Sequence, residues 1–290
     1  MNEQDKFQTA FRRFDATEPD EVVAKRAAAI RDAHFAENFA RKDVWAKIYG
    51  CIDLTTLHAT DTETTIRKWV ERVNGADGAR PALPNVAALC TYPIFTEVVR
   101  QSLLAGGVKI AVVAGGFPSA QTFSEVKIAE TAMSVMGGAD EIDTVMNLGY
   151  FFDGAFEALT DELAEIKDSC LQATLKVILE TGALRTAENI RRAAILSLYS
   201  GADFIKTSTG KDYPGATPEA VYVMCRVIRQ YEALSGRRAG IKISGGVRTV
   251  EDAVLYYTLV KELLGEEWLD SRFFRIGASR LADDIVQRME

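Results

Sequence analysis

The chain has 290 residues, 48% of them hydrophobic, and its 41 acidic and 34 basic residues give a formal net charge of −7. This length and apolar content allow a large buried core, and no apolar run reaches the ~20 residues of a membrane-spanning helix. An acidic chain without a Lys/Arg-rich stretch is not expected to bind nucleic acid. Four widely spaced cysteines and an N-terminus without a signal pattern predict a reduced, cytoplasmic protein.

Residues 1–49 precede the first expected strand and predict an N-terminal helical extension. A helix start at 17–21 is followed by apolar residues at helical spacing: Val22, Val23, Ala27, Ile30, Phe35 and Phe39. We expect this extension to pack on outer helices, with coverage of the closed end of a barrel or association between copies as alternatives. Residues 50–290 show no linker and are predicted to form one barrel.

From about residue 50, short apolar runs alternate with helical patterns about every 30 residues, as in repeated βα units. The eight expected strands are 51–54, 86–91, 110–114, 141–146, 175–180, 204–207, 240–244 and 274–277. Eight such units predict an α/β fold, a (β/α)8 TIM barrel with its active site on the loops after the strands. A doubly wound open sheet is the alternative, but no Gly-x-Gly-x-x-Gly follows the first strand.

Two lysines lie in consecutive expected strands, Lys206 in Asp-Phe-Ile-Lys and Lys242 in Gly-Ile-Lys-Ile. One helical pattern, 218–233, separates them, so the two strands should be neighbours in a parallel sheet. A buried cation needs an ion pair, a shifted pKa or a chemical role. Repulsion between the two ammonium groups is expected to leave one amine partly neutral, and a neutral lysine can attack a carbonyl carbon.

Carboxylates are expected in the same barrel interior. Asp143 has the alternation required to point inward toward Lys206, and it is the candidate proton carrier. Asp53, Lys176 and Glu180 are further inward candidates that balance charge as readily as they react. Nearby carboxylates would raise a lysine pKa. The spacing of residues in the sequence therefore does not decide whether the pKa of a strand lysine is raised or lowered; the three-dimensional arrangement does.

The late loops predict a phosphate site. Glycines allow the backbone N–H groups to approach an anion, and the last two strands of barrels commonly carry such a site. The candidates are Gly210, Lys211, Gly245, Gly246, Gly277 and Ser279. The sequence around Lys211 is not a Walker loop, because Asp212 follows the lysine and the earlier glycine is missing.

No metal site is expected, because the chain has only two histidines, His34 and His58. His34 is expected on the surface of the extension, and His58 in the loop after the first strand. Cys90 is expected to be a small buried residue at the end of the second strand.

Several long motifs in order resemble the deoxyribose-phosphate aldolase family over nearly the whole predicted barrel. The most specific are Ala-Asp-Phe-Ile-Lys-Thr-Ser-Thr-Gly at 202–210, Lys-Ile-Ser-Gly-Gly-Val-Arg-Thr at 242–249, Ala-Asp-Glu-Ile-Asp at 139–143 and Leu-Lys-Val-Ile-Leu-Glu-Thr at 175–181. Arg280 departs from the family pattern, in which many members carry a second serine. The C-terminal tyrosine of some relatives is also absent.

The resemblance implies a class I aldolase in which Lys206 forms the Schiff base, Lys242 tunes its pKa and Asp143 takes part in proton transfer. The substrate would be 2-deoxy-D-ribose 5-phosphate, cleaved reversibly to D-glyceraldehyde 3-phosphate and acetaldehyde. The resemblance implies no cofactor, and it makes a homodimer plausible. Two alternatives stay open from the residues alone: a Schiff-base lyase for another phosphorylated sugar, and a barrel that binds a phosphosugar without turning it over.

Overall fold

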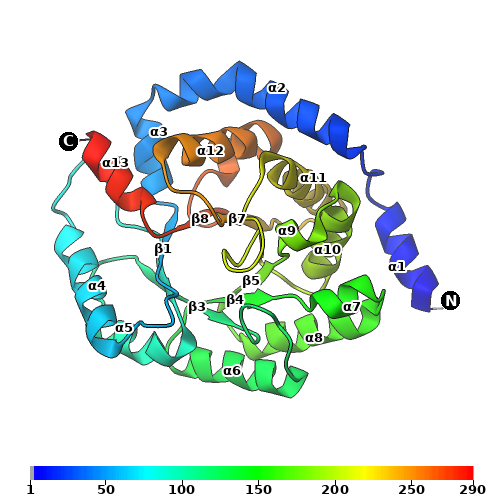
Figure 1. The fold of residues 1–290 in the computed structure, drawn as a ribbon, viewed down its shortest axis with the longest axis horizontal. Helices are drawn as coiled ribbons and strands as arrows, with labels where there is room; N and C mark the ends of the chain where they lie inside the picture. The colour runs from blue at the N-terminus through cyan, green and yellow to red at the C-terminus, as the bar shows by residue number, and fades with distance from the viewer. Residues whose placement is uncertain (1–2, 290) are drawn as a thin grey trace.

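Eight parallel strands close into a barrel in chain order in the computed structural model, which describes residues 3–289 (Figure 1). The strands are β1 (Ile52–Thr55), β2 (Ala88–Thr91), β3 (Lys109–Ala114), β4 (Glu141–Val145), β5 (Thr174–Ile178), β6 (Phe204–Lys206), β7 (Gly240–Ser244) and β8 (Phe274–Ala278). The predicted (β/α)8 barrel is confirmed. Both ends of every expected strand lie within two residues of the ends of the observed strand. The open-sheet alternative is wrong, because β1 pairs with β8.

Helices connect the strands and form the outer ring of the barrel (Figure 1). They are α4 (Glu63–Ala76), η1 (Pro93–Phe95), α5 (Thr96–Ser102), α6 (Ser124–Met136), α7 (Leu148–Phe152), α8 (Phe156–Ser169), α9 (Thr181–Leu184), α10 (Ala187–Tyr199), α11 (Pro218–Ser235), α12 (Val250–Leu264), η2 (Glu266–Trp268) and α13 (Leu281–Met289). Threonine hydroxyls cap four of these helices by accepting a hydrogen bond from the backbone N–H three residues on: Thr62, Thr186, Thr217 and Thr249. These caps stabilise the helix starts that follow strands β1, β5, β6 and β7. None of the helices between residues 3 and 289 has the length and apolar content needed to cross a membrane.

Three helices precede β1: α1 (Glu3–Arg12), α2 (Asp20–Phe39) and α3 (Lys42–Tyr49). The longest, α2, packs on the outside of α11 and α12 (Figure 1). Val23 and Ala27 are buried in this contact, and Asn38 Nδ2 donates a hydrogen bond of 3.1 Å to Thr258 Oγ1 on α12. The extension therefore packs on outer helices, the first of the expected placements. The division into units 1–49 and 50–290 stays a prediction.

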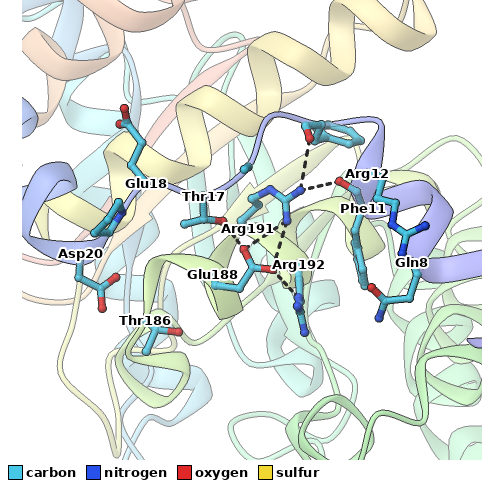
Figure 2. A pocket seen from close by; sticks show the side chains of 13 residues that line it. Gln8, Phe11, Arg12, Thr17, Glu18, Asp20, Thr186, Glu188, Arg191 and Arg192 are labelled. Atoms are coloured by element: carbon cyan, nitrogen blue, oxygen red, sulfur yellow. Dashed lines mark hydrogen bonds and ion pairs between the residues drawn. The ribbon is translucent and has the colours of Figure 1, made fainter.

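The turn between α1 and α2 is fastened to α10 by one arginine (Figure 2). The Arg191 guanidinium donates hydrogen bonds to the carbonyl oxygens of Phe11 and Asp15, at 2.5 and 2.9 Å. Glu188 orients this guanidinium from the same helix and also accepts a hydrogen bond from the Thr17 hydroxyl. Arg191 is itself only 7% exposed, so its guanidinium is a largely buried link between this turn and α10.

Candidate active site

Seven charged side chains occupy inward positions of the barrel. Alternation along each strand sends every second residue to the interior, and six of the eight strands place charged groups there. These residues are Asp53 on β1, Glu141 and Asp143 on β4, Lys176 on β5, Lys206 on β6, Lys242 on β7 and Arg275 on β8. All seven are no more than 5% exposed.

Asp143 lies at the centre of this cluster and is bonded by three lysines. Its Oδ2 accepts hydrogen bonds of 2.7 Å from both Lys206 Nζ and Lys242 Nζ, and its Oδ1 accepts one of 3.0 Å from Lys176 Nζ. Strand register explains the arrangement, because Lys206 is paired with Lys242 and Asp143 with Lys176. The two ammonium groups are thus at most about 5.4 Å apart, since each lies 2.7 Å from the same oxygen.

A second set of ion pairs lies next to this centre and includes two residues that sequence reasoning missed. Arg275 binds Glu141 at 2.6 Å and Asp53 at 2.6 Å, and Glu141 also accepts a 2.5 Å hydrogen bond from Lys176. Asp53 Oδ2 lies 2.5 Å from Lys242 Nζ. Strand alternation could have identified both residues, because side chains two positions apart point to the same face of a strand. Glu141 is two residues before Asp143, and Arg275 is two residues before Gly277.

The charges of the seven residues do not cancel when all are ionised. Four cations face three carboxylates in the buried cluster. Removing a proton from one lysine balances the cluster, and a buried cluster of zero net charge costs less than one with a surplus cation. The arrangement therefore favours one neutral amine.

The surroundings of the two strand lysines determine which amine is neutral. Burial is the main cause that lowers the pKa of Lys206, and the Lys242 ammonium acts in the same direction against the attraction of Asp143. Burial also acts on Lys242, but the attraction of both Asp143 and Asp53 outweighs it and raises the pKa of that amine. Burial opposes ionisation of Asp143, yet the three lysines hold the pKa of its carboxyl well below the ordinary value. Of the two strand lysines, Lys206 is therefore the one with the lowered pKa, because Lys242 has a second carboxylate, Asp53, beside its ammonium group.

A cavity of about 240 Å³ opens from these lysines toward the loops after the strands. Its floor includes Lys206 and Lys242, and its walls include the backbone of the β6, β7 and β8 loops. All six residues predicted for phosphate lie in this wall: Gly210, Lys211, Gly245, Gly246, Gly277 and Ser279. His58 and Arg248 also line the cavity, and sequence reasoning had not assigned Arg248 a role.

The sequence model of the DeoC/LacD family of aldolases matches residues 48–262. This chain belongs to that family. It is 39% identical over 278 residues to the deoxyribose-phosphate aldolase of Homo sapiens, covering 92% of this chain and 87% of the relative. The Bos taurus deoxyribose-phosphate aldolase is 38% identical over 253 residues, 84% of this chain and 80% of the relative. The solved deoxyribose-phosphate aldolase of Aeropyrum pernix superposes with a TM-score of 0.64 at 26% identity, covering 88% and 94% of the two chains.

Glycines of this aldolase make room where the loops and Lys242 crowd together. A Cβ on Gly277 would lie 2.9 Å from Ser244 Cβ and 3.2 Å from Lys242 Cε. A Cβ on Gly215 would lie 2.1 Å from the carbonyl oxygen of Gly245, which itself has a φ of 85°. The absence of side chains therefore lets the β6 and β7 loops touch and leaves space for the Lys242 stem.

Glu180 positions the β6 loop of the aldolase. It follows β5 in a left-handed backbone conformation, and its carboxylate accepts hydrogen bonds from the Thr209 N–H and hydroxyl. Burial is the main cause that raises the pKa of this carboxyl. The sequence left open whether Glu180 balances charge or reacts, and in the structure its carboxylate contacts the β6 loop. Lys211 Nζ donates to the Leu57 carbonyl oxygen and joins the β6 and β1 loops.

Part of the remaining interior is apolar. Ala88 and Cys90 on β2 pack with Ala111 and Val113 on β3 and with Leu57. Cys90 is fully buried in this wall, as expected, and burial raises the pKa of its thiol. The barrel thus presents small apolar side chains on one side of its interior and the charged cluster on the other.

Proposed function

We propose that this chain cleaves 2-deoxy-D-ribose 5-phosphate reversibly to D-glyceraldehyde 3-phosphate and acetaldehyde, with Lys206 as the Schiff-base nucleophile. Membership of the DeoC/LacD aldolase family supports an aldol cleavage. Relatives about 40% identical over most of the chain are named deoxyribose-phosphate aldolases. The observation that carries the assignment of Lys206 is its lowered pKa beside Lys242 and Asp143 at the floor of a cavity.

In the first half of the reaction, the neutral Lys206 amine attacks the aldehyde carbon of the open-chain sugar. Loss of water gives a protonated iminium, which withdraws electrons from the neighbouring carbon. A base removes the proton of the C3 hydroxyl as the C2–C3 bond breaks, and D-glyceraldehyde 3-phosphate leaves. Asp143 suits this proton transfer, directly or through water, because its depressed pKa keeps it ionised.

In the second half, the enamine left on Lys206 takes up a proton at C2 and is hydrolysed to acetaldehyde. Leu57 lines the cavity and packs with the small side chains of β2 and β3, so the site has an apolar side that suits a two-carbon fragment. Lys242 keeps its proton throughout, because Asp53 and Asp143 stabilise its charge. Its role is to disfavour protonation of the free Lys206 amine, so that this amine is available for attack.

The substrate phosphate is assigned to the loop wall of the cavity. Gly210, Gly245 and Gly246 have φ values of 77°, 85° and 90°, a left-handed conformation that glycine adopts readily and that lets the backbone approach an anion closely. Gly277 and Ser279 precede α13, and Lys211 supplies a positive charge on the opposite loop. Backbone N–H groups at such sites bind phosphate oxygens without requiring a buried cation.

Borohydride trapping tests the proposal. The full chain is incubated with acetaldehyde, reduced with borohydride and mapped by peptide mass spectrometry. We expect the reduced adduct on Lys206, no turnover in Lys206→Ala, and preference for deoxyribose 5-phosphate in a panel of phosphorylated sugars. An adduct on Lys242 would reverse the two roles, and a folded protein without any adduct would refute Schiff-base catalysis.

A further inference from the structure

Glu180 occupies an irregular position where β5 ends beside β6, its neighbour in the barrel (Figure 1). The N–H of Leu179 donates to the carbonyl oxygen of Lys206 at 2.9 Å. The N–H of Thr181 donates to that of Thr207 at 2.8 Å. Between these two bonds the chain advances two residues after β5 but only one after β6, so Glu180 is the extra residue of a bulge. Bulges beside active sites re-aim a side chain, and the φ of 54° at Glu180 lies in the left-handed region that such residues rarely adopt.

The bulge directs the Glu180 carboxylate onto the loop that follows β6. The Thr209 N–H donates to its Oε1 at 3.2 Å, and the Thr209 hydroxyl donates to its Oε2. Glu180 is 3% exposed and Thr209 is 7% exposed, so these bonds to a carboxylate lie in a low dielectric, where they are strong. A residue in an unfavourable backbone conformation persists only where surrounding contacts hold it, and these two bonds are such contacts.

The Thr209 hydroxyl connects Glu180 to residues that line the cavity. A hydroxyl has one proton to donate and lone pairs that accept. Because the carboxylate takes the proton, the Thr209 oxygen accepts a hydrogen bond of 3.2 Å from the Lys211 N–H. This bond closes the turn at Gly210, whose φ is 77°. Gly210 and Lys211 line the cavity that also contains Lys206, whereas Glu180 lies behind them.

Other contacts hold the two ends of the β6 loop, so the effect of Glu180 is confined to the turn between them. The start of the loop is bonded to β7, because Ser244 Oγ donates to the Ser208 carbonyl oxygen at 2.6 Å. Near the far end, a Cβ on Gly182 would lie 2.3 Å from the carbonyl oxygen of Pro214, so α9 and the loop touch. Loss of the Glu180 carboxylate therefore frees this turn and leaves the floor of the barrel in place.

We propose that Glu180 is a positioning residue for the substrate phosphate. It holds Thr209 so that Gly210 and Lys211 meet the phosphate, and it thereby sets the preference of the site for phosphorylated over unphosphorylated sugars. The inference rests on the proposed function, which assigns the phosphate to this loop wall. The Glu180 carboxylate bonds to Thr209 and not to Lys206, so cleavage of an unphosphorylated sugar should depend on it little.

Steady-state kinetics of the full chain with 2-deoxy-D-ribose 5-phosphate and with 2-deoxy-D-ribose test the proposal. Glu180→Gly removes the carboxylate while allowing the left-handed backbone, so it separates the two hydrogen bonds from backbone strain. We expect kcat/KM for the phosphorylated sugar to fall roughly 10-fold or more, mainly through KM, as for loss of hydrogen bonds to a charged group. The value for the unphosphorylated sugar should stay close to that of wild type.

Three further variants separate positioning from a general loss of stability. Arg185→Gly is the matched control, because Arg185 is the left-handed residue at the other end of α9, with a φ of 66°, and its side chain is exposed. It should keep the wild-type preference. Glu180→Gln retains an oxygen that accepts from Thr209 and should recover part of the preference. Thr209→Val removes the hydroxyl from the other side of the contact and should shift the preference in the same direction, which keeps the test open if the glycine variant is unstable.

Calorimetric titration of the full chain with inorganic phosphate tests Glu180 without turnover. Phosphate binding should weaken roughly 10-fold in Glu180→Gly. A wild type that cleaves neither sugar would refute the proposed function, and the titration would still test the role of Glu180. An unchanged preference in folded Glu180→Gly, equal losses for both sugars, or an unchanged phosphate affinity would overturn that role while leaving the aldolase assignment intact.

Discussion

Replacing Lys242 with methionine should raise the pKa of Lys206. The acid limb of the pH–rate profile should therefore move to higher pH. The ammonium groups are at most about 5.4 Å apart, since both lie 2.7 Å from Asp143 Oδ2. At an effective dielectric near 20, two charges at this distance repel by roughly 3 kcal/mol, which corresponds to about two pKa units. Methionine keeps the length of the side chain while removing this charge.

The Lys242→Met substitution has two electrostatic consequences, and both raise the pKa of Lys206. Loss of the Lys242 charge removes repulsion from protonated Lys206, and it leaves Asp143 with one cation fewer to share. Both favour the charged form of Lys206, so its pKa rises. Below that pKa the neutral fraction falls tenfold for each unit, and the rate at fixed acidic or neutral pH should fall about 100-fold. Activity should recover as the pH is raised.

The assay is the rate of Lys206 trapping by acetaldehyde and cyanoborohydride between pH 5 and 10, together with kcat/KM for cleavage. Trapping reports the reactive amine without the later proton transfers, so it separates a pKa effect from loss of a proton carrier. Lys176→Met is the comparator, because Lys176 binds the other Asp143 oxygen at 3.0 Å, and its acid limb should move less. An unmoved or lowered acid limb in folded Lys242→Met would refute the electrostatic reasoning.

Three further predictions concern the support of the site and the extension. Gly277→Ala should lower kcat and destabilise the protein by about 1–3 kcal/mol, because its Cβ would lie 3.2 Å from Lys242 Cε. Urea unfolding and steady-state kinetics measure these effects. The control is Gly75→Ala, which meets no atom within 4 Å and, being in helix α4, should keep kcat and be at least as stable as wild type. Arg275→Met should destabilise the protein by about 3 kcal/mol, because buried Glu141 and Asp53 each lose one cation and keep only their lysine partners. Adding Glu141→Gln should recover part of the loss, and equal stability of the single variant and wild type would contradict the buried-pair argument. Arg191→Ala should speed proteolysis between residues 12 and 19 without changing kcat, since it removes the hydrogen bonds to Phe11 and Asp15; unchanged cleavage would show that other contacts hold this turn.

Much of the fold follows from local sequence patterns. The strands of this barrel are short, buried apolar runs with regular helical patterns between them, so their number and order could be read without tertiary information. Glu141 and Arg275 were missed as site residues although they alternate correctly with Asp143 and Gly277. Each is charged and lies near the start of its strand, where a charged residue is equally consistent with a solvated strand end.

The sequence by itself determined that Lys206, Lys242 and Asp143 point into one barrel, because alternation and a single crossover between strands are local properties. Tertiary structure alone decided which amine has the lowered pKa. Asp53 reaches Lys242 from a strand 189 residues earlier and lies 2.5 Å from its Nζ. Electrostatic energies depend on such distances between charges on different strands, and strand register and barrel closure set those distances.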